Sequence, residues 1–450
     1  MRKQRPKALI AMSGGVDSSV AAFLMQQEGY DCTGVTMKLL PDSLRSETQR
    51  NVGDARAVCA QLGMAHHVFD FSGEFKSLVM DTFVAAYTQG LTPNPCIECN
   101  RHFKFKRLIA CAKELGFDCL ATGHYARIDF DESSRCHLLK TGIDTRKDQS
   151  YALYQMRREQ LAFVRFPLGE LTKEQVRALA AEQGFLTAKK SESQGVCFIP
   201  DGDHAAFIRA YDLDCPEDCS ADYPVDSSTG CHTGIYEGRV PDSRPGLQPG
   251  PIVNEQGLQL KTHEGIINFT VGQRRGIGLA ASEPLYVKEI RAETNTVVVV
   301  PRSGLGNTVA ILDDVNILAC QDLQNLGEFA SSALPHPPST LPHPSPEPPS
   351  QPSLTAPESL PEPPPHRSPT SSELLSPLFR GSSPVPVLAR HRYHCAPLRA
   401  YVKRLETGRL MVCYEKPVRD LTCGQALVLY DAHEGEIVLA GGTIIKTETK

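Results

Sequence analysis

Hydrophobic and polar positions alternate regularly over the first two hundred residues. Short apolar runs of strand length are followed by longer segments in which apolar residues recur three and four positions apart, the spacing of an amphipathic helix. Several of these segments are followed by glycine, which is common just beyond helix ends. The pattern predicts strands at 8–12, 30–37, 67–71 and 119–122, and helices at 20–28, 51–62, 75–89, 105–115 and 171–183.

This alternation is typical of an α/β fold, in which helices cover both faces of a parallel sheet. We predict such a domain over residues 1–205. Ligands of these sheets bind at the carboxyl ends of the strands. The segment 13–18, Met37 and the Gly123-His124 pair are therefore expected along one rim of the sheet.

Two further regions follow with different patterns. Residues 206–283 are crowded with Asp, Cys, Pro and Gly, and they end in a strand-like run, IINF, followed by a Gly- and Arg-rich turn. We interpret them as a small central linking domain. Residues 284–450 contain short apolar runs at even spacing, among them LYVKEI and NTVVVVP, which predict a small C-terminal β-barrel.

A proline-rich segment interrupts this last region at 328–386. It is dominated by Pro, Ser, Glu and Leu, and its PHPPSTLPHPSPEPPSQPS stretch cannot bury enough apolar surface to fold. We predict a disordered insertion with partial polyproline-II character. A spacer is the simplest role for it, and a docking site for a proline-reading partner is the alternative.

Length and composition limit the number of domains and the cellular location that we expect. Its 450 residues are enough for two or three domains, and the absence of any run of about twenty apolar residues argues against a membrane span. The start, MRKQRPK, lacks the apolar stretch of a signal peptide. The 15 cysteines, an odd number without an export signal, favour a reducing cytoplasmic location over a disulfide scaffold.

A net charge of −5 excludes a general binder of polyanions, so contacts with nucleic acid would need local basic patches. Three basic pairs fit either such patches or ordinary solvated surface, namely Arg157-Arg158, Lys189-Lys190 and Arg274-Arg275.

The strongest chemical signal is the loop SGGVDSS at 13–19, between the first strand and the first helix. Adjacent glycines allow a tight turn and the close approach of a ligand, and a helix N-terminus favours an anion. A kinase-type phosphate loop would carry a lysine, and this loop has none. The pattern SGG-x-DS instead resembles the ATP pyrophosphatase (PP-loop) superfamily, which cleaves ATP between its α and β phosphates. The alternative is a simple Ser-Gly turn.

Three cysteines form a second candidate constellation. Cys96 and Cys99 are spaced C-x-x-C within 91–100, where two prolines indicate an exposed, non-helical turn. The basic run that follows, which includes Lys104, would lower the pKa of nearby thiols. Cys197 stands alone in SQGVCFI. A zinc site would usually add a second C-x-x-C, and none is present. Reactive thiols and inert buried thiols both remain open at this point.

Seven motifs in order resemble the tRNA-specific 2-thiouridylase family, which makes 2-thiouridine at the wobble position of certain tRNAs. They are SGGVDSSV, NPC-x-x-CN with its following KFK run, ATGHYAR, KDQSYAL, SQGVCFI, VGQRRGIG and RYHC. The resemblance covers nearly the whole chain except the proline-rich segment. It implies a PP-loop domain with an adenine nucleotide α-hydrolase-like fold at the N-terminus.

The resemblance also implies site residues. Cys99 would be the nucleophile, and Cys197 would carry the persulfide sulfur and form a transient disulfide with Cys99. Other implied contacts are ATP at Ala11, Met12, Ser13, Gly14, Gly15, Val16, Asp17, Ser18, Met37 and Gly123, the target base at Asn94, Pro95 and Cys96, and tRNA at His124, Lys147, Asp148, Gln149, Arg392, Tyr393 and Gln425. Some relatives have Asp in place of Cys96, which argues against a required thiol there. An iron–sulfur cluster on Cys96, Cys99 and Cys197 is a less favoured alternative, and no other metal site is predicted.

The implied enzyme is a tRNA-uridine 2-sulfurtransferase. AMP would be attached to the C2 carbonyl oxygen of the wobble uridine (U34), pyrophosphate would leave, and persulfide sulfur would replace the activated oxygen. Mg²⁺ would share the phosphate charge, while Asp17 would position the metal or phosphate or simply cap the helix.

The implied substrates are the anticodon loops of the Lys, Glu and Gln tRNAs, and the implied sulfur donor is a cysteine desulfurase or a sulfur-relay carrier. The alternatives are another PP-loop ligase or tRNA-modifying enzyme, and a catalytically silent RNA-binding protein.

Overall fold

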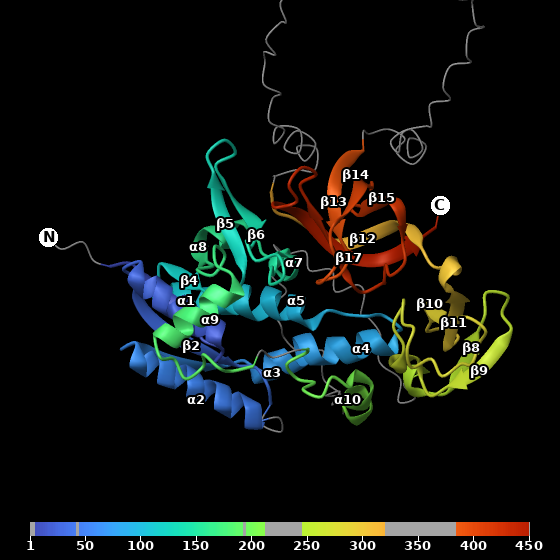
Figure 1. Ribbon diagram of the computed structural model, residues 1–450, viewed down its shortest axis with the longest axis horizontal. Coiled ribbons are helices and arrows are strands. Elements are labelled where there is room, and N and C mark those ends of the chain that lie inside the picture. Colours follow the sequence, from blue (N-terminus) through green and yellow to red (C-terminus); the bar gives the residue numbers. More distant parts are fainter. Residues whose placement is uncertain (1–4, 42–44, 192–194, 212–244, 320–383, 450) are drawn as a thin grey trace, which may run out of the picture.

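The computed structural model describes residues 5–41, 45–191, 195–211, 245–319 and 384–449. It contains a first domain built on a parallel sheet, a small central sheet and a closed β-barrel (Figure 1). The predicted α/β class with a C-terminal barrel is therefore confirmed. The predicted insertion lies outside the described residues except for its last three positions, of which Val385 and Pro386 belong to a strand.

Five parallel strands form the first sheet in the order β3-β2-β1-β4-β7. They span β1 Lys7–Ala11, β2 Asp31–Lys38, β3 Ala65–Asp70, β4 Cys119–Ala121 and β7 Val164–Arg165. The four strands predicted from apolar runs are thus confirmed. The chain winds outward from β1 to β3 on one side and from β4 to β7 on the other, so β1 and β4 flank the switch point where ligands bind in open parallel sheets.

Helical structure is present in all five predicted segments. The bounds of the helices are α1 Val16–Gln27, α2 Arg45–Gln61, α3 Ser72–Phe75, α4 Thr82–Thr88, α5 Pro95–Cys99, α6 Leu108–Glu114, α7 Ser150–Leu153, α8 Arg158–Phe163, α9 Lys173–Glu182 and α10 His204–Ala210. Of these, α5, α7, α8 and α10 are additional helices that the apolar spacing does not predict. Two π-helical segments, η2 Lys76–Asp81 and η3 Asn100–Arg107, join α3 to α4 and α5 to α6. Within the described residues, no helix combines the length and apolarity that a membrane crossing requires.

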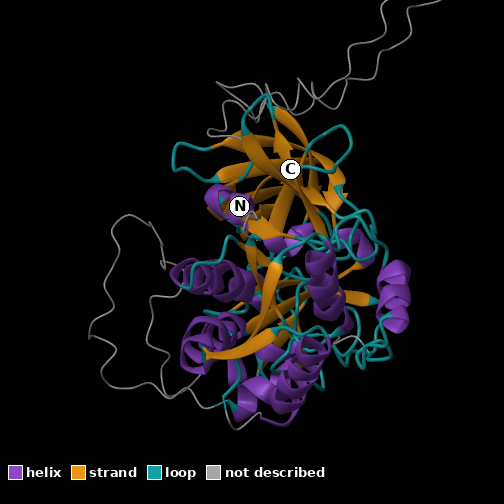
Figure 2. Cartoon of the chain, turned by 90° about the vertical axis from the view of Figure 1, so that its left-hand side faces the viewer, coloured by secondary structure: helices purple, strands orange, loops and turns teal. Residues whose placement is uncertain are grey.

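Helices cover both faces of the first sheet, because successive side chains of a strand point to opposite sides. On one face, Ala8 and Ile10 of β1 pack with apolar residues of α1, α2 and α9. On the other face, Leu9 packs with Phe105 and Leu108 at the junction of η3 and α6. Figure 2 shows helices on either side of these strands.

The central sheet has the order β10-β11-β8-β9, with bounds β8 Gly250–Val253, β9 Gln259–His263, β10 Leu285–Arg291 and β11 Thr296–Pro301. The two strands at 285–301, which the sequence pattern groups with the barrel, therefore pair in the central sheet. Their apolar side chains share a cluster with Ile252 and Ile266, which explains the pairing.

One strand expected in this region is wrong. The segment 266–268 forms a 3-10 turn, η5 Ile266–Asn268, after Gly265 at φ +110°. Two other short 3-10 turns, η4 Pro245–Leu247 and η6 Arg302–Gly304, flank the central sheet.

The barrel closes in the order β12-β15-β14-β13-β16-β17 around its own apolar core. Its strands span β12 Asn307–Ile317, β13 Val385–Arg390, β14 Leu398–Arg404, β15 Leu410–Val418, β16 Ala426–Tyr430 and β17 Val438–Glu448. A hairpin of the first domain, β5 Ala126–Asp131 and β6 Cys136–Thr141, reaches it through an isolated bridge between Lys140 and Ile437.

The barrel docks on the first domain through buried polar bonds and a shared core. Arg390 of β13 donates to the buried Asp148 carboxylate at 2.6 Å. The Tyr151 hydroxyl of α7 donates to the Ala426 carbonyl at 2.8 Å. Apolar residues of both units, including Leu9 of β1, belong to one cluster. The two units therefore form a continuous interior.

Candidate functional site

The loop after β1 is held in a tight conformation that only glycine fits. Gly14 has φ +71°, and a Cβ there would lie 2.3 Å from the backbone oxygen of Asn51. The Ser18 hydroxyl accepts from the Ser13 amide at 3.2 Å and donates to the Gly15 carbonyl at 3.0 Å. Gly15 is the N-cap of α1 and offers no side-chain cap. Amide groups of the first helical turn therefore face the position that an anion would take.

Asp17 is fixed by two donors rather than acting as a helix cap. Its Oδ1 accepts from Lys173 Nζ at 2.7 Å and from the Tyr125 hydroxyl at 2.7 Å. The ammonium also lies 5.6 Å from the centre of the Tyr125 ring. Gly15 is the N-cap of α1, so the capping interpretation of Asp17 is not supported, and its role in positioning metal or phosphate stays a prediction.

Lys190 supports the same loop from outside it. Its Nζ donates to the Gly14 carbonyl at 2.9 Å, to Asn51 Oδ1 at 2.8 Å and to Asp54 Oδ2 at 2.6 Å. The sequence offers surface and tRNA contact as the two interpretations of this lysine, and the structure places it instead behind the phosphate loop.

The expected rim is present. A Cβ on Gly123, which follows β4, would lie 2.8 Å from the carbonyl carbon of Asp17 and 2.9 Å from the Ser18 amide. Met37 near the end of β2 packs against two apolar clusters, one of which contains Cys99. The ten residues predicted to bind ATP thus share the carboxyl edge of β1, β2 and β4, and ATP binding by them stays a prediction.

The C-x-x-C pair lies on a helix, so the expected non-helical turn is wrong for these positions. Pro95 occupies the first turn of α5, where its missing N–H costs nothing. Asn94 is the N-cap, and its Oδ1 accepts from the Cys96 amide at 3.2 Å. Cys99 ends α5, and the side chain of the next residue, Asn100, donates to the Ala152 carbonyl of α7 at 2.8 Å.

Cys99 and Cys197 come together although they lie 98 positions apart in the chain. Cys99 is 8 % exposed and shares an apolar cluster with Phe198 and Ile199, the two residues after Cys197. The Phe198 ring packs against Phe83 with centroids 5.3 Å apart, which anchors this segment beside α4. Both cysteines are free thiols, of which Cys99 is buried and Cys197 is exposed to solvent.

The thiol pKa values differ from the expected direction. Burial raises the pKa of Cys99 to about 11, and burial followed by the charges of Cys99 and Cys96 raises that of Cys197 to about 12. Lys104 opposes both shifts, as the basic run predicts, but it is outweighed. Both cysteines are therefore protonated thiols at neutral pH in the free chain.

Comparisons with known proteins decide the family. Three family models match, described as tRNA methyl transferase HUP domain at 6–201, tRNA methyl transferase PRC-barrel domain at 242–301 and Aminomethyltransferase beta-barrel domain at 373–444. A protein named tRNA-specific 2-thiouridylase MnmA from Chloroflexus aggregans is 36% identical over 446 residues, which cover 98% of each chain. This chain belongs to the tRNA-specific 2-thiouridylase family.

A second thiouridylase of the same name, from Roseiflexus castenholzii, is 35% identical and covers 98% of this chain and 99% of its own. Among solved structures, a 4-thiouridine synthetase–RNA complex with bound ATP shows 19% identity and a TM-score of 0.32 over 45% of this chain and 50% of that chain. That likeness is too low to support an argument.

Two of the seven tRNA contacts predicted for this thiouridylase-family chain are buried. His124 is 6 % exposed, and its Nδ1 lies 2.7 Å from the Thr122 hydroxyl. Burial and the charge of Lys104 hold the pKa of His124 well below its usual range, so the ring is neutral. Asp148 is 4 % exposed and bound by Arg390. Both side chains therefore make their contacts with other protein groups, and neither is exposed enough to meet RNA in the free chain.

The other five tRNA predictions lie at the junction of the first domain and the barrel. Gln149 Oε1 accepts from the Tyr125 amide at 2.9 Å, and Gln425 donates to the Thr92 carbonyl at 2.8 Å. Tyr393 packs against Tyr151 with centroids 6.1 Å apart. Lys147 and Arg392 are partly exposed. Contact of all five with tRNA stays a prediction.

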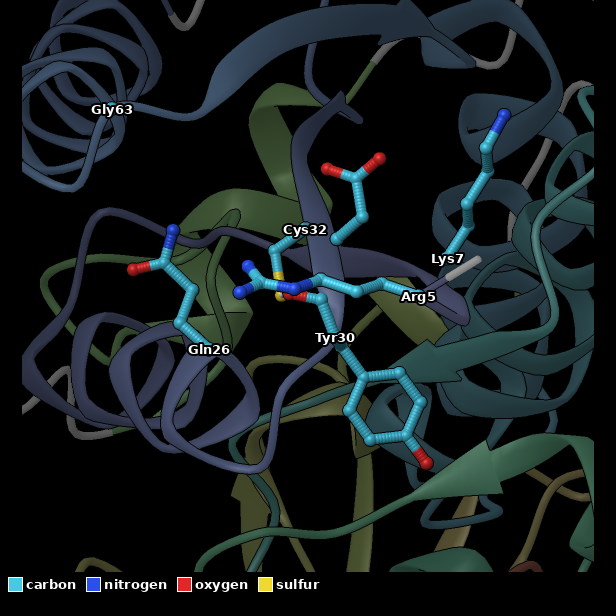
Figure 3. Close-up of a pocket in the computed structure, with 7 residues that line it drawn as sticks. Arg5, Lys7, Gln26, Tyr30, Cys32 and Gly63 are labelled. Carbon is cyan, nitrogen blue, oxygen red and sulfur yellow. Dashed lines mark hydrogen bonds between the residues drawn. The ribbon is translucent and has the colours of Figure 1, made fainter. Parts of the chain in front are cut away.

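The three cysteines are not arranged as a metal site. Among the described residues, no group of three or more His, Cys, Asp or Glu side chains is placed to hold a metal ion, so the iron–sulfur alternative gains no support. An open pocket of about 450 Å³, lined by Arg5, Lys7, Tyr30 and Cys32, lies at the amino ends of β1 and β2, away from the rim (Figure 3).

Proposed function

We propose that the chain catalyses ATP-dependent 2-thiolation of the wobble uridine (U34) of tRNA, with release of AMP and pyrophosphate. The observation that carries this proposal is the meeting of Cys99 and Cys197 beside the rim that holds the phosphate loop. Gly123 touches that loop, and the next residue, His124, lies 3.4 Å from Lys104, whose charge acts on both thiols. A nucleobase between these groups would be within reach of both chemistries.

The first half of the proposed reaction is adenylation. The C2 carbonyl of uridine has no leaving group, and transfer of AMP to its oxygen creates one. The glycine loop would hold the departing pyrophosphate through backbone amides, and Lys190 and Lys173 keep the loop and Asp17 in place. The Lys173 and Tyr125 bonds both go to Oδ1 of Asp17, and its Oδ2 is the oxygen that would serve as a ligand for Mg²⁺. Bound Mg²⁺ would share the phosphate charge.

The second half is sulfur transfer. The terminal sulfur of a Cys197 persulfide attacks C2, and AMP leaves. The Cys99 thiol then attacks the inner sulfur, a Cys99–Cys197 disulfide forms, and the C=S group remains on the base. The two electrons that reduce the sulfane sulfur come from the two thiols, and a dithiol reductant restores them for the next cycle. Asn94, Pro95 and Cys96 would contact the target base.

The barrel and α7 would grip the anticodon loop, because Tyr393 packs on Tyr151 of α7 and Gln425 bonds to Thr92, two residues before the Asn94 cap of the cysteine helix. The proposed substrates are the Lys, Glu and Gln tRNAs, and the proposed persulfide donor is a cysteine desulfurase or a sulfur-relay carrier. Extrusion of the base from its stack would let it reach Cys99, which is 8 % exposed. The proposed location of the enzyme is the cytoplasm.

The test is mass spectrometry of nucleosides from tRNA incubated with the enzyme, ATP and a persulfide donor. The wild-type chain should give 2-thiouridine, and Cys99→Ser and Cys197→Ser should each give none while still binding ATP. Cys111→Ser, a partly exposed thiol on α6, is the matched control and should retain activity. Thiolated tRNA from either active-site variant, or incorporation of an amine in place of sulfur, would overturn the proposal.

A further inference from the structure

A second set of reactive groups lies on the barrel, in the segment that follows β13. His391 Nε2 lies 2.9 Å from Asp420 Oδ1, and Cys395 Sγ lies 3.8 Å from His391 Nδ1. Arg392 Nε lies 3.1 Å from the other oxygen of Asp420. A thiol, an imidazole and a carboxylate in this order form the arrangement in which imidazole takes the thiol proton and the carboxylate orients the ring.

The hydroxyl of Tyr414 is a second and independent sign that this cluster receives a ligand. Tyr414 on β15 is 2 % exposed, and its hydroxyl has no hydrogen-bond partner among the described residues. Its ring packs edge-on against His391 with centroids 6.2 Å apart. Burial, then the charges of Cys395 and Asp420, raises the pKa of Tyr414, so the hydroxyl lies near these groups. A buried donor of this kind is suited to an acceptor atom bound at Cys395.

The charges around the cluster favour the thiolate. Burial would lower the pKa of His391, but its bonds to Asp420 and Cys395 raise it to about 9. Burial would raise the pKa of Cys395, but the hydrogen bond and the charge of His391 lower it below its usual range. The other charged or titratable groups facing the cluster from neighbouring elements are Arg390, Arg392, Tyr151 and Tyr414. Burial keeps both tyrosines neutral, so neither adds negative charge beside the thiolate.

The segment that carries the cluster lies near Cys96 of the cysteine helix α5. Tyr393, two positions before Cys395, packs against Tyr151 of α7, and the charge of Cys96 contributes to its raised pKa. The Cys395 thiol itself is partly exposed, and its S–H has the Arg392 carbonyl, 3.1 Å away, as acceptor in the neutral form. On ionisation this proton passes to His391 Nδ1, and the sulfur becomes available to a reagent from solvent.

We propose that Cys395 is a sulfur-accepting site that takes sulfane sulfur from a persulfide, with His391 and Asp420 as its positioning residues. The Cys395 thiolate attacks the outer sulfur of R–S–SH, a new S–S bond forms, and the old S–S bond breaks. The departing R–S⁻ takes the proton from His391, and Cys395–S–SH remains. One sulfur atom moves between two thiols, so no oxidant or reductant is consumed. The supply of persulfide rests on the proposed function, and the site lies outside the Cys99–Cys197 pair.

The experiment uses the full chain and glutathione persulfide, followed by peptide mass spectrometry that resolves each cysteine. The Cys395 peptide should gain the mass of one sulfur atom. With iodoacetamide at about pH 6.5, Cys395 should react roughly tenfold faster than Cys423. Cys423 is the matched control, because it lies in the same barrel with similar exposure and burial raises its pKa.

Two variants separate positioning from a merely structural role. Asp420→Asn and His391→Gln should keep a folded barrel by circular dichroism, yet move the pH profile of Cys395 alkylation to higher pH. An unchanged profile would remove His391 and Asp420 from the proposal. Equal rates at Cys395 and Cys423, or no sulfur on the Cys395 peptide, would overturn the site itself.

A third variant keeps this proposal distinct from the proposed function. The chain carrying both Cys99→Ser and Cys197→Ser should lose tRNA thiolation and still take up sulfur at Cys395. If the wild-type chain thiolates tRNA normally but gains no sulfur at Cys395, the Cys395 site is refuted and the proposed function is not.

Discussion

Lys173 Nζ donates to Asp17 Oδ1 at 2.7 Å, which ties the start of α9 to the phosphate loop. Only 7 % of the lysine side chain is exposed, against 33 % for the aspartate. The carboxylate of the loop is therefore oriented before any nucleotide arrives, with the Tyr125 hydroxyl as its second donor. A charged group that is already oriented stabilises developing charge most effectively, because it need not reorient during the reaction.

Lys173→Met should impair both stability and adenylation. Loss of the buried ammonium leaves Asp17 with one donor fewer, at a cost of about 2 kcal/mol in unfolding free energy, discounted because the aspartate is partly exposed. Pyrophosphate release from ATP should fall at least roughly tenfold. Lys288→Met is the control, because its ion pair with Glu255 is exposed and should be worth less than about 1 kcal/mol. Equal effects of the two variants would contradict the positioning role.

Gly14→Ala should abolish ATP binding. The new Cβ would meet the Asn51 backbone oxygen at 2.3 Å, and the positive φ adds strain of about 1 kcal/mol. Isothermal titration with a non-hydrolysable ATP analogue measures the loss. Gly53→Ala is the control on α2, where an added Cβ meets nothing within 4 Å, and it should leave ATP affinity unchanged. Normal ATP affinity in the Gly14 variant would show that the loop can relax away from α2.

Arg390→Met should destabilise the junction between barrel and first domain. The Asp148 and Arg390 side chains are 3 % and 11 % exposed, and leaving the carboxylate unpaired costs about 3–5 kcal/mol. Urea unfolding measures the change. The double variant with Asp148→Leu should recover part of the loss, since it removes the uncompensated charge. Arg291→Met, which breaks an ion pair whose partners are both 50 % exposed, should change stability by less than about 1 kcal/mol.

His391 should make stability depend on pH in the alkaline range. Its pKa is raised from 6.5 to about 9 in the folded chain, so protonated His391 favours folding. This contribution, at most about 3 kcal/mol, is complete below about pH 6.5 and is lost as pH rises through about 9. Unfolding free energies measured across this window should fall in the wild-type chain and fall less in His391→Gln. Parallel curves would contradict the raised pKa.

Local sequence was sufficient for the phosphate loop and the first sheet. A short apolar run, two glycines and a helical spacing specify strand, turn and helix within about twenty residues, and the structure has β1, the loop and α1 at these positions. The cysteine helix was missed for a local reason. Two prolines in three residues predict a non-helical turn, but Pro95 stands in the first turn of α5 behind the Asn94 cap, where proline is favoured.

The supporting lysines could not be assigned because their partners are distant in the chain. Lys173 lies 156 positions from Asp17, and Lys190 lies 176 positions from Gly14. Neither lysine has a local signal other than its charge. The strands at 285–301 show the same limit, since an apolar run does not reveal which sheet completes its pairing. The Cys395 cluster likewise needs Asp420, which a turn beyond β15 brings to it.

The first domain and the barrel share one interior, so neither unit is expected to be stable without the other. Asn100, next to Cys99, holds α7, and Tyr151 of α7 holds β16. Cutting the chain between the two units would leave apolar faces open to water on both fragments. The barrel is thus no detachable unit that recombination could exchange between proteins, and the first domain produced alone is expected to aggregate.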